Sequence, residues 1–171
     1  MRPAESFTPA ELAAAPAGTA TEEMRALDRR TIELGTPGIT LMERAGVGLA
    51  REILGLRAVV LRQGVLVLAG RGNNGGDGFV IARLLRKRKI PVRLALVAAR
   101  EDVVGDARVN LDRWVRSRGV IQNLADADGL ERLDRELVRV GIVVDALLGT
   151  GLRADVRGVL GAVIERLNHA R

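Results

Sequence analysis

Cysteine and tyrosine are absent from the 171-residue sequence, and its aromatic residues are two Phe and one Trp. Without cysteine the chain forms neither disulfide bonds nor thiolate metal sites, which is typical of the reducing cytoplasm. So few aromatic rings provide no visible platform for stacking single-stranded nucleic acid. The sequence also lacks a signal segment and an apolar run long enough to cross a bilayer. We therefore expect a soluble, cytoplasmic protein with no membrane partner, and nucleic acid is not the expected ligand.

Basic residues outnumber acidic ones by 27 to 21, which gives a formal net charge of +6. All of the basic residues are arginine except Lys87 and Lys89. The densest basic cluster, residues 86–89, follows an apolar helical pattern, where cations complement the negative end of the helix dipole. We interpret this cluster as a solvated helix end and not as a nucleic-acid patch.

The length and the apolar content of 47% are sufficient for one substantial core. Residues 1–18 are predicted to form a flexible N-terminal arm, and residues 19–171 one domain. Two helices are predicted first, from Thr19 to Gly35 and from Thr40 to Gly55, each opening with capping-box spacing. Beyond them, apolar patterns predict strands at 65–69, 91–97, 120–124 and 141–145, alternating with helices at 79–89, 106–118, 126–137 and 159–167. The predicted fold class is α/β, with a doubly wound, mostly parallel, Rossmann-like sheet preceded by two N-terminal helices.

The run Gly70–Gly78 contains five glycines in nine residues and joins a predicted strand to a predicted helix that starts at Phe79. Glycines allow backbone N–H groups to crowd together, and the positive end of the helix dipole points back into the run. An anion, and most simply a phosphate, is therefore the expected ligand.

The same run has two other interpretations. Its first three glycines satisfy G-x-G-x-x-G, the fingerprint of NAD(P)-dependent dehydrogenases. That fingerprint expects an acidic residue at the end of the second strand, where this sequence has Arg100 followed by Glu101. A plain strand-to-helix turn is the other interpretation, but such a turn has no need of Asn73, Asn74 and Asp77.

The strand predicted at 141–145 is apolar until it ends in Asp145, and the loop 149–153 follows it. In open parallel sheets, ligands bind at the carboxyl ends of the strands. A helix-capping role for Asp145 is the alternative, although the next few residues do not resemble a helix start. Elsewhere, Trp114 is expected in the core and His169, the only histidine, in solvent.

Three segments resemble the NAD(P)H-hydrate epimerase family, also called the YjeF N-terminal domain. They are N-N-G-G-D-G-F-V-I-A-R at 73–83, V-D-A-L-L-G-T-G-L at 144–152, and the N-terminal pair of helices. In that pair, Glu23-Met24, Asp28 and the segment 41–46 match, with Arg44 in place of the usual Asn. Taken alone, Asp28 and Glu43 are expected to be solvated or capping groups. The resemblance covers about residues 20–170.

The resemblance implies an isomerase that interconverts the R and S forms of hydrated NADH and NADPH (NADHX and NADPHX) in nicotinamide-cofactor repair. It implies a potassium ion held by Asn74 and Asp145. Asp145 also borders the presumed site of the nicotinamide ring, so it is our candidate for the acid/base group. The implied partners are an NAD(P)H-hydrate dehydratase domain that depends on ADP or ATP, fused or separate, and a second copy of the chain in a homodimer. The implied substrate-binding residues are Asn73, Asn74, Gly75, Gly76, Asp77, Gly149, Thr150, Gly151, Leu152, Arg153, Ala154 and Asp155.

In the family, the last helix leads to another strand and an Asp-x-Pro-Ser-Gly motif, which these 171 residues do not contain. We therefore expect a domain truncated at its C-terminal end, with strand 141–145 either at a sheet edge or paired with a segment outside these residues, and little activity in the chain alone. A catalytically inactive interaction or RNA-binding module is the alternative function. The charge of +6 and the missing motif favour that alternative, whereas the retained Asn74, Asp77 and Asp145 favour the enzyme.

Overall fold

The computed structural model describes residues 19–124, 127–149 and 156–170. The chain divides into two units, Met1–Gly38 and Ile39–Arg171, and each is described by itself. In the first unit, α2 spans Thr19–Glu33, as the sequence predicts. Gly35 follows this helix with φ 94°, a left-handed conformation that glycine adopts without strain at helix ends.

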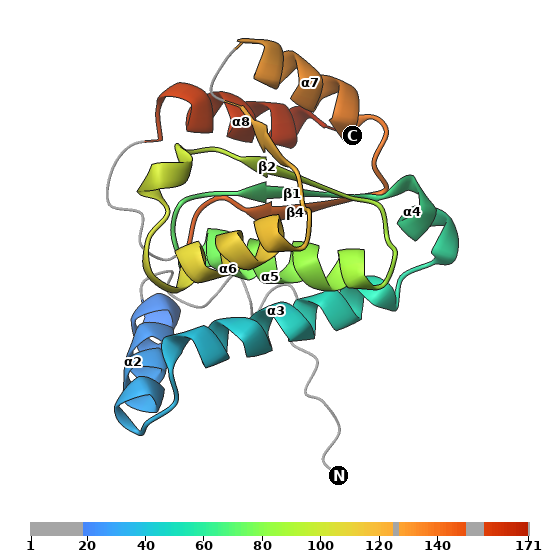
Figure 1. Cartoon of the computed structure of the whole chain (residues 1–171). Helices are drawn as coiled ribbons and strands as arrows, with labels where there is room; N and C mark the ends of the chain where they lie inside the picture. Colours follow the sequence, from blue (N-terminus) through green and yellow to red (C-terminus); the bar gives the residue numbers. More distant parts are fainter. Residues whose placement is uncertain (1–18, 125–126, 150–155, 171) are drawn as a thin grey trace. The chain divides into compact units, whose positions relative to one another are not determined.

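The second unit contains a four-stranded parallel sheet with the strand order β3-β2-β1-β4 (Figure 1). The chain runs from β1 outward to β2 and β3, and then crosses back to β4 on the other side of β1. The sequence therefore predicted the fold class correctly, and of the two positions considered for the fourth strand, the sheet edge is observed. The strands are β1 (Val65–Ala69), β2 (Val92–Leu96), β3 (Ile121–Asn123) and β4 (Ile142–Ala146).

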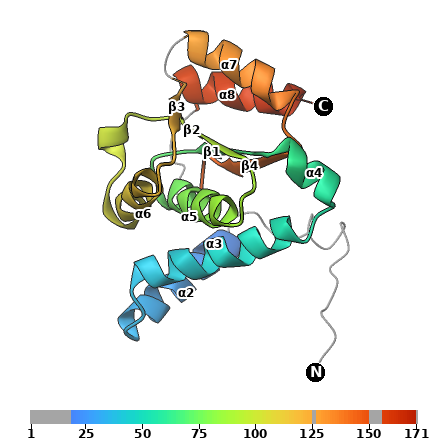
Figure 2. The same ribbon diagram turned by 45° about the vertical axis from the view of Figure 1, so that its right-hand side comes forward.

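Helices cover both faces of this sheet (Figures 1 and 2). One apolar cluster joins the sheet to α3, α5 and α6, and the other joins it to α7 and α8. All five residues of β1 are buried because this central strand is covered on both faces. The helices are α3 (Gly38–Leu54), α4 (Ala58–Gln63), α5 (Asn73–Lys87), α6 (Gly105–Arg116), α7 (Ala127–Leu137) and α8 (Gly158–His169), with a 3₁₀ turn at Arg100–Asp102.

Trp114 lies in the core, as predicted, with 1% of its surface exposed. Its indole N–H donates to the carbonyl of Val120 at 3.2 Å, which satisfies the polar group of a buried ring. A Cβ atom at Gly119 would collide with this ring. The turn after α6 therefore closes over Trp114 only because residue 119 is glycine.

The predicted start of α3 was wrong. The helix begins at Gly38, directly after Pro37 and two residues before Thr40. Thr40 therefore lies inside the helix, and Glu43 does not complete a capping box. The six-residue α4 and the three-residue 3₁₀ turn were not predicted, since such short elements carry too little periodicity.

No helix in the described ranges has both the length and the apolar character that crossing a bilayer requires.

Candidate functional site

The candidate site lies at the carboxyl ends of β1 and β4, where the strand order reverses. These two strands are parallel neighbours, with Leu68 opposite Asp145 and Ala69 opposite Ala146. The backbone N–H of Gly70 donates to the carbonyl of Ala146 at 2.9 Å, so the pairing continues one residue beyond β1. Open α/β sheets bind their ligands at such a reversal point. We call this end of β1 and β4, with the residues that follow each strand, the carboxyl rim.

Helix α5 begins at Asn73 and not at Phe79, so the predicted helix start was wrong. The N–H of Gly76 already donates a helical bond to the carbonyl of Gly72, at 3.0 Å. Gly72 is the N-cap residue, and it has no side chain with which to cap the helix. The N–H groups of residues Asn73–Gly75 precede the first helical bond, and such groups at a helix start are donors for an anion.

Glycines place the start of α5 directly against the strand ends. A Cβ atom at Gly75 would collide with the carbonyl oxygen of Gly70, and one at Gly70 would collide with the carbonyl oxygen of Leu147. A Cβ atom at Gly76 would instead lie 2.6 Å from Sδ of Met42 in α3. Gly75 therefore faces the strand ends, while Gly76 faces α3, and a side chain at residue 76 would enter the core before it reached an anion at the rim.

Asn74 connects the start of α5 to the loop after β4. Its side-chain N–H group donates to the carbonyl of Leu148 at 3.0 Å, across 74 residues of sequence. The side chain is half-buried. Because the nitrogen is engaged in this bond, the amide oxygen is the atom that remains to accept a hydrogen bond or bind a cation.

Asp145 lies within β4 near its carboxyl end and is exposed. Its Oδ1 accepts a hydrogen bond from the N–H of Leu147 at 3.0 Å. This local bond shapes the turn that leaves the strand, so part of the alternative capping role is observed, although for a turn and not for a helix. The second carboxylate oxygen remains for a ligand or a proton.

The donor set of the rim fits a hard cation such as potassium. Asn74 offers an amide oxygen and Asp145 a carboxylate oxygen, and oxygen ligands suit such ions. The tie from Asn74 to Leu148 and the pairing of β1 with β4 hold both residues at one end of two adjacent strands. Within the described ranges, no three His, Cys, Asp or Glu side chains form a metal-binding group.

The other predicted substrate-binding residues are placed as follows. Asn73 is exposed at the start of α5, and Asp77 is half-buried one turn later. Gly149 is exposed beside Asn74, and a Cβ atom there would lie 3.4 Å from the Asn74 Cβ. Six predicted residues lie outside the described ranges: Thr150, Gly151, Leu152, Arg153, Ala154 and Asp155.

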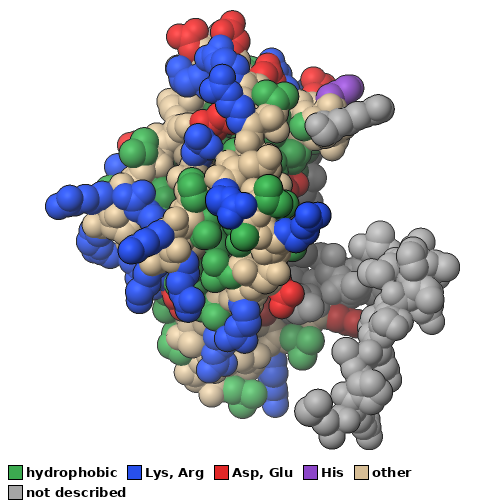
Figure 3. Space-filling view, turned by 90° about the vertical axis from the view of Figure 1, so that its right-hand side faces the viewer, with side chains coloured by type: hydrophobic (Ala, Val, Ile, Leu, Met, Phe, Trp, Pro, Cys, Tyr) green, Lys and Arg blue, Asp and Glu red, His purple; other side chains and the backbone are tan. Residues whose placement is uncertain are grey.

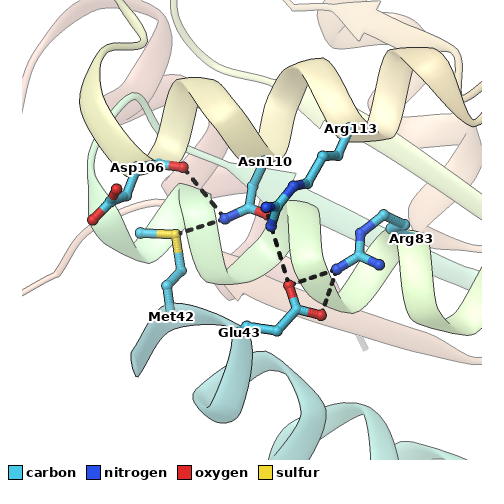
Figure 4. Close-up of polar contacts among 6 residues, drawn as sticks. All are labelled: Met42, Glu43, Arg83, Asp106, Asn110 and Arg113. Atoms are coloured by element: carbon cyan, nitrogen blue, oxygen red, sulfur yellow. Dashed lines mark hydrogen bonds and ion pairs between the residues drawn. The ribbon is translucent and has the colours of Figure 1, made fainter. Parts of the chain in front are cut away.

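A second polar cluster joins α3, α5 and α6 (Figure 4). A guanidinium nitrogen of Arg83 donates to both carboxylate oxygens of Glu43 at 2.6 Å, and Arg113 approaches Glu43 at 3.5 Å. The sequence suggested that Glu43 is a capping or solvated group. For Glu43 that expectation was wrong, because two arginines bind its carboxylate. The pairing was missed because 40 residues separate Glu43 from Arg83. The available signal was an arginine directly after the apolar run 79–82.

A pocket of about 350 Å³ lies at this second cluster, lined by Ile39, Thr40, Glu43, Arg83 and Arg113. None of the carboxyl-rim residues lines it. The pocket is thus separate from the predicted site, and its carboxylate is already bound by two cations.

The fully buried Asn110 links α6 to α3 in the same region (Figure 4). Its amide N–H group donates to Sδ of Met42 at 3.1 Å and to the carbonyl of Asp106 at 3.3 Å. Met42 is also the side chain that a Cβ atom at Gly76 would strike. Asn110 therefore fixes the side chain that packs over the first turn of α5.

Comparison with known proteins relates this chain to one family. The family described as YjeF-related protein N-terminus matches residues 38–171. The chain is 39% identical over 150 residues to the bifunctional NAD(P)H-hydrate repair enzyme Nnr of Moorella thermoacetica, covering 86% of this chain and 28% of that protein. It is 41% identical over 145 residues to the NAD(P)H-hydrate epimerase of Rhodobacter capsulatus, covering 81% of this chain and 64% of that protein.

Among solved structures, the crystal structure of yeast ynu0 (YNL200c) superimposes with a TM-score of 0.72, covering 88% of this chain and 64% of that chain. At 22% identity this match supports the fold alone. The chain spans less than two thirds of the length of these relatives. The family match covers most of the sequence and includes both motifs of the carboxyl rim, so the chain belongs to the YjeF-related N-terminal family.

Proposed function

We propose that this protein interconverts the R and S forms of hydrated NADH and NADPH, as an isomerase in the repair of nicotinamide cofactors. Relatives about 40% identical to the chain are named NAD(P)H-hydrate epimerase or repair enzyme. One observation carries the proposal: the amides at the start of α5, the Asn74 side chain and Asp145 share the rim at the strand-order reversal.

Substrate binding begins with the pyrophosphate at the start of α5. The amides of residues 73–75 and the positive end of the helix dipole favour such an anion. The loop after β4, tied to this helix start through Asn74 and Leu148, would form the other wall. Residues 149–155 would then contact the remainder of the dinucleotide.

Epimerisation at a hydroxylated carbon next to a ring nitrogen requires a group that gives and takes protons there. Asp145 is our candidate because one of its carboxylate oxygens is held by Leu147 and the other remains at the exposed rim. The bond to Leu147 keeps the carboxylate oriented, which a positioned acid/base group needs.

We further propose potassium as the ion held by Asn74 and Asp145. A bound potassium ion would supply positive charge where an anionic substrate is held. An NAD(P)H-hydrate dehydratase that depends on ADP or ATP, fused or separate, would consume the product, and the cytoplasm is the proposed compartment.

Two substitutions of Asp145 test these roles separately. Asp145→Ala removes both the acid/base group and the ligand, whereas Asp145→Asn keeps an oxygen ligand but has no carboxyl group with which to take or give a proton. We expect Asp145→Ala to lower epimer exchange, followed by chromatography, by at least about 100-fold. Glu165→Ala, at an exposed acid of α8 away from the rim, is the matched control.

Thermal shift in potassium separates the two roles. An acid/base role predicts that Asp145→Asn loses exchange but keeps the potassium-dependent rise in Tm. A ligand role alone predicts that Asp145→Asn keeps both exchange and this rise, because its amide oxygen replaces the carboxylate oxygen as a ligand. If Asp145→Ala exchanges epimers at the rate of the Glu165→Ala control, the proposed site is wrong.

A further inference from the structure

The end of the sheet opposite the proposed site gathers basic residues from four separate segments. Residues 56–64 precede β1, residues 86–91 precede β2, residues 116–120 precede β3 and residues 138–141 precede β4. Because all four strands are parallel, these segments meet at the amino ends of the strands. We call this surface the amino rim.

The amino rim carries nine basic residues and no acidic one: Arg57, Arg62, Arg86, Lys87, Arg88, Lys89, Arg116, Arg118 and Arg139. All nine are exposed, and no ion pair holds any of them among the described residues. Outside these segments the sequence contains 18 basic and 21 acidic residues. The positive net charge of the protein therefore arises entirely from this rim, and Figure 3 shows basic side chains spread over this side.

Helix dipoles explain only part of this charge. The helices α4, α5, α6 and α7 end shortly before the strands, and each helix end carries roughly half a negative charge. Four such ends balance about two cations, which leaves most of the nine without a structural partner.

The backbone angles of two of these basic residues are a second, independent observation about the amino rim. Among the described residues, Lys89 and Arg118 are the only non-glycine residues with positive φ, each at 61°. Each follows a helix end, where glycine is the usual residue. Both lie in the amino rim, so the chain keeps a cation at two positions where glycine would relieve backbone strain.

Apolar side chains lie between these cations. Leu56 and Val59 are each 47% exposed, Val120 is 74% exposed and Val138 is 81% exposed. Figure 3 shows hydrophobic side chains interspersed with the basic ones on this side. A phosphodiester backbone would engage the cations but has no apolar partner for these side chains, and the four segments contain no aromatic residue for stacking. The interface of an anionic bilayer accommodates both kinds of side chain.

We propose that the amino rim is a docking surface for anionic phospholipid bilayers, bound peripherally with the carboxyl rim facing away from the lipid. This differs from the expectation of no membrane partner, because that expectation considered spanning segments and treated residues 86–89 as one isolated helix end.

Sedimentation of the whole chain with vesicles tests the proposal, using phosphatidylcholine with and without phosphatidylglycerol. We expect binding only to the phosphatidylglycerol vesicles and loss of binding at high salt. The double variant Lys89→Gly/Arg118→Gly should raise Tm and yet weaken vesicle binding about fivefold for each cation removed. A purely structural role for these residues predicts the rise in Tm without the loss of binding.

Two further variants complete the test. Arg44→Gln/Arg100→Gln removes the same charge from exposed positions outside the rim and should bind vesicles like the wild type. Val120→Ser/Val138→Ser should weaken vesicle binding at unchanged charge.

Three results would overturn the proposal. One is equal sedimentation with both kinds of vesicle. Another is an equal loss of vesicle binding in Lys89→Gly/Arg118→Gly and in the control Arg44→Gln/Arg100→Gln. The third is tighter binding to duplex DNA than to phosphatidylglycerol vesicles, together with no effect of the valine substitutions, which would make the rim a nucleic-acid surface.

Discussion

The two ends of the parallel sheet are built from different residue types and held by different forces. At the carboxyl rim, glycines let α5 approach β1 and the loop after β4 so closely that a Cβ atom would strike a backbone carbonyl. Asn74 then adds a hydrogen bond from the helix to that loop. At the amino rim, nine exposed cations occupy four segments, and no ion pair with a described residue holds them.

The carboxyl rim is therefore defined by close packing, and the amino rim by its charge. Close backbone contact tolerates almost no added volume, because the carbonyls of Gly70 and Leu147 belong to the backbone directly after two paired strands. Exposed cations make few contacts, so their replacement alters long-range electrostatics more than packing. We therefore expect the carboxyl rim to be sensitive to single atoms and the amino rim to ionic strength.

The largest effect is expected at Gly75. Replacing it with Ala puts a methyl group against the Gly70 carbonyl and should lower the free energy of unfolding by about 3 kcal/mol. Gly48→Ala is the control, since a Cβ atom at that exposed position of α3 meets no atom within 4 Å. There, alanine should raise the free energy of unfolding by up to about 1 kcal/mol. Urea denaturation followed by circular dichroism measures both, and equal changes would contradict the proposed role of backbone contact.

A smaller effect is expected at Asn74. Replacing it with Leu removes the hydrogen bond to the Leu148 carbonyl and should lower the free energy of unfolding by about 1.5 kcal/mol. The same replacement at Asn73, which is exposed, should change it by less than about 0.5 kcal/mol. If the two variants unfold at the same urea concentration, the tie between α5 and the β4 loop does not stabilise the rim.

At the amino rim, one substitution should stabilise the protein. Lys89 has φ 61°, so Lys89→Gly should raise the free energy of unfolding by about 1 kcal/mol. Lys87→Gly, within the last turn of α5, should lower it by a similar amount, about 1 kcal/mol, because glycine weakens a helix. Thermal unfolding distinguishes the two variants by the opposite signs of their Tm shifts. Shifts of the same sign would show that backbone strain at Lys89 is not relieved by glycine.

The smallest effect is a response to salt. Raising ionic strength from about 0.01 M to 0.15 M shortens the Debye length from about 30 Å to about 8 Å and screens repulsion among the nine cations. Wild-type Tm should rise by about 1–2 °C. The rise should shrink in Lys87→Gln/Arg88→Gln and stay unchanged in Asn74→Leu. A full rise in the charge variant would place the repulsion elsewhere in the molecule.

The sequence by itself determined the fold class and the position of the main motifs. The five residues of β1 were predicted with their observed limits, because an unbroken apolar run followed by glycine is a local signal. The doubly wound, mostly parallel sheet was predicted from the alternation of strands and helices, and β1 and β4 are parallel neighbours in it. The family was recognised from the segments around Asn74 and Asp145 and is confirmed by the match over residues 38–171.

Only the tertiary structure decided which groups meet. Helix α5 starts at Asn73 because its glycines pack against Gly70 and Met42. From the sequence alone, the same glycines indicate a loop. Glu43 meets Arg83 across 40 residues, a separation that periodicity does not resolve. The amino rim arises because parallel strands bring the segments before them to one end of the sheet. Four groups of cations, most of which are ordinary for a helix end, thereby become one surface.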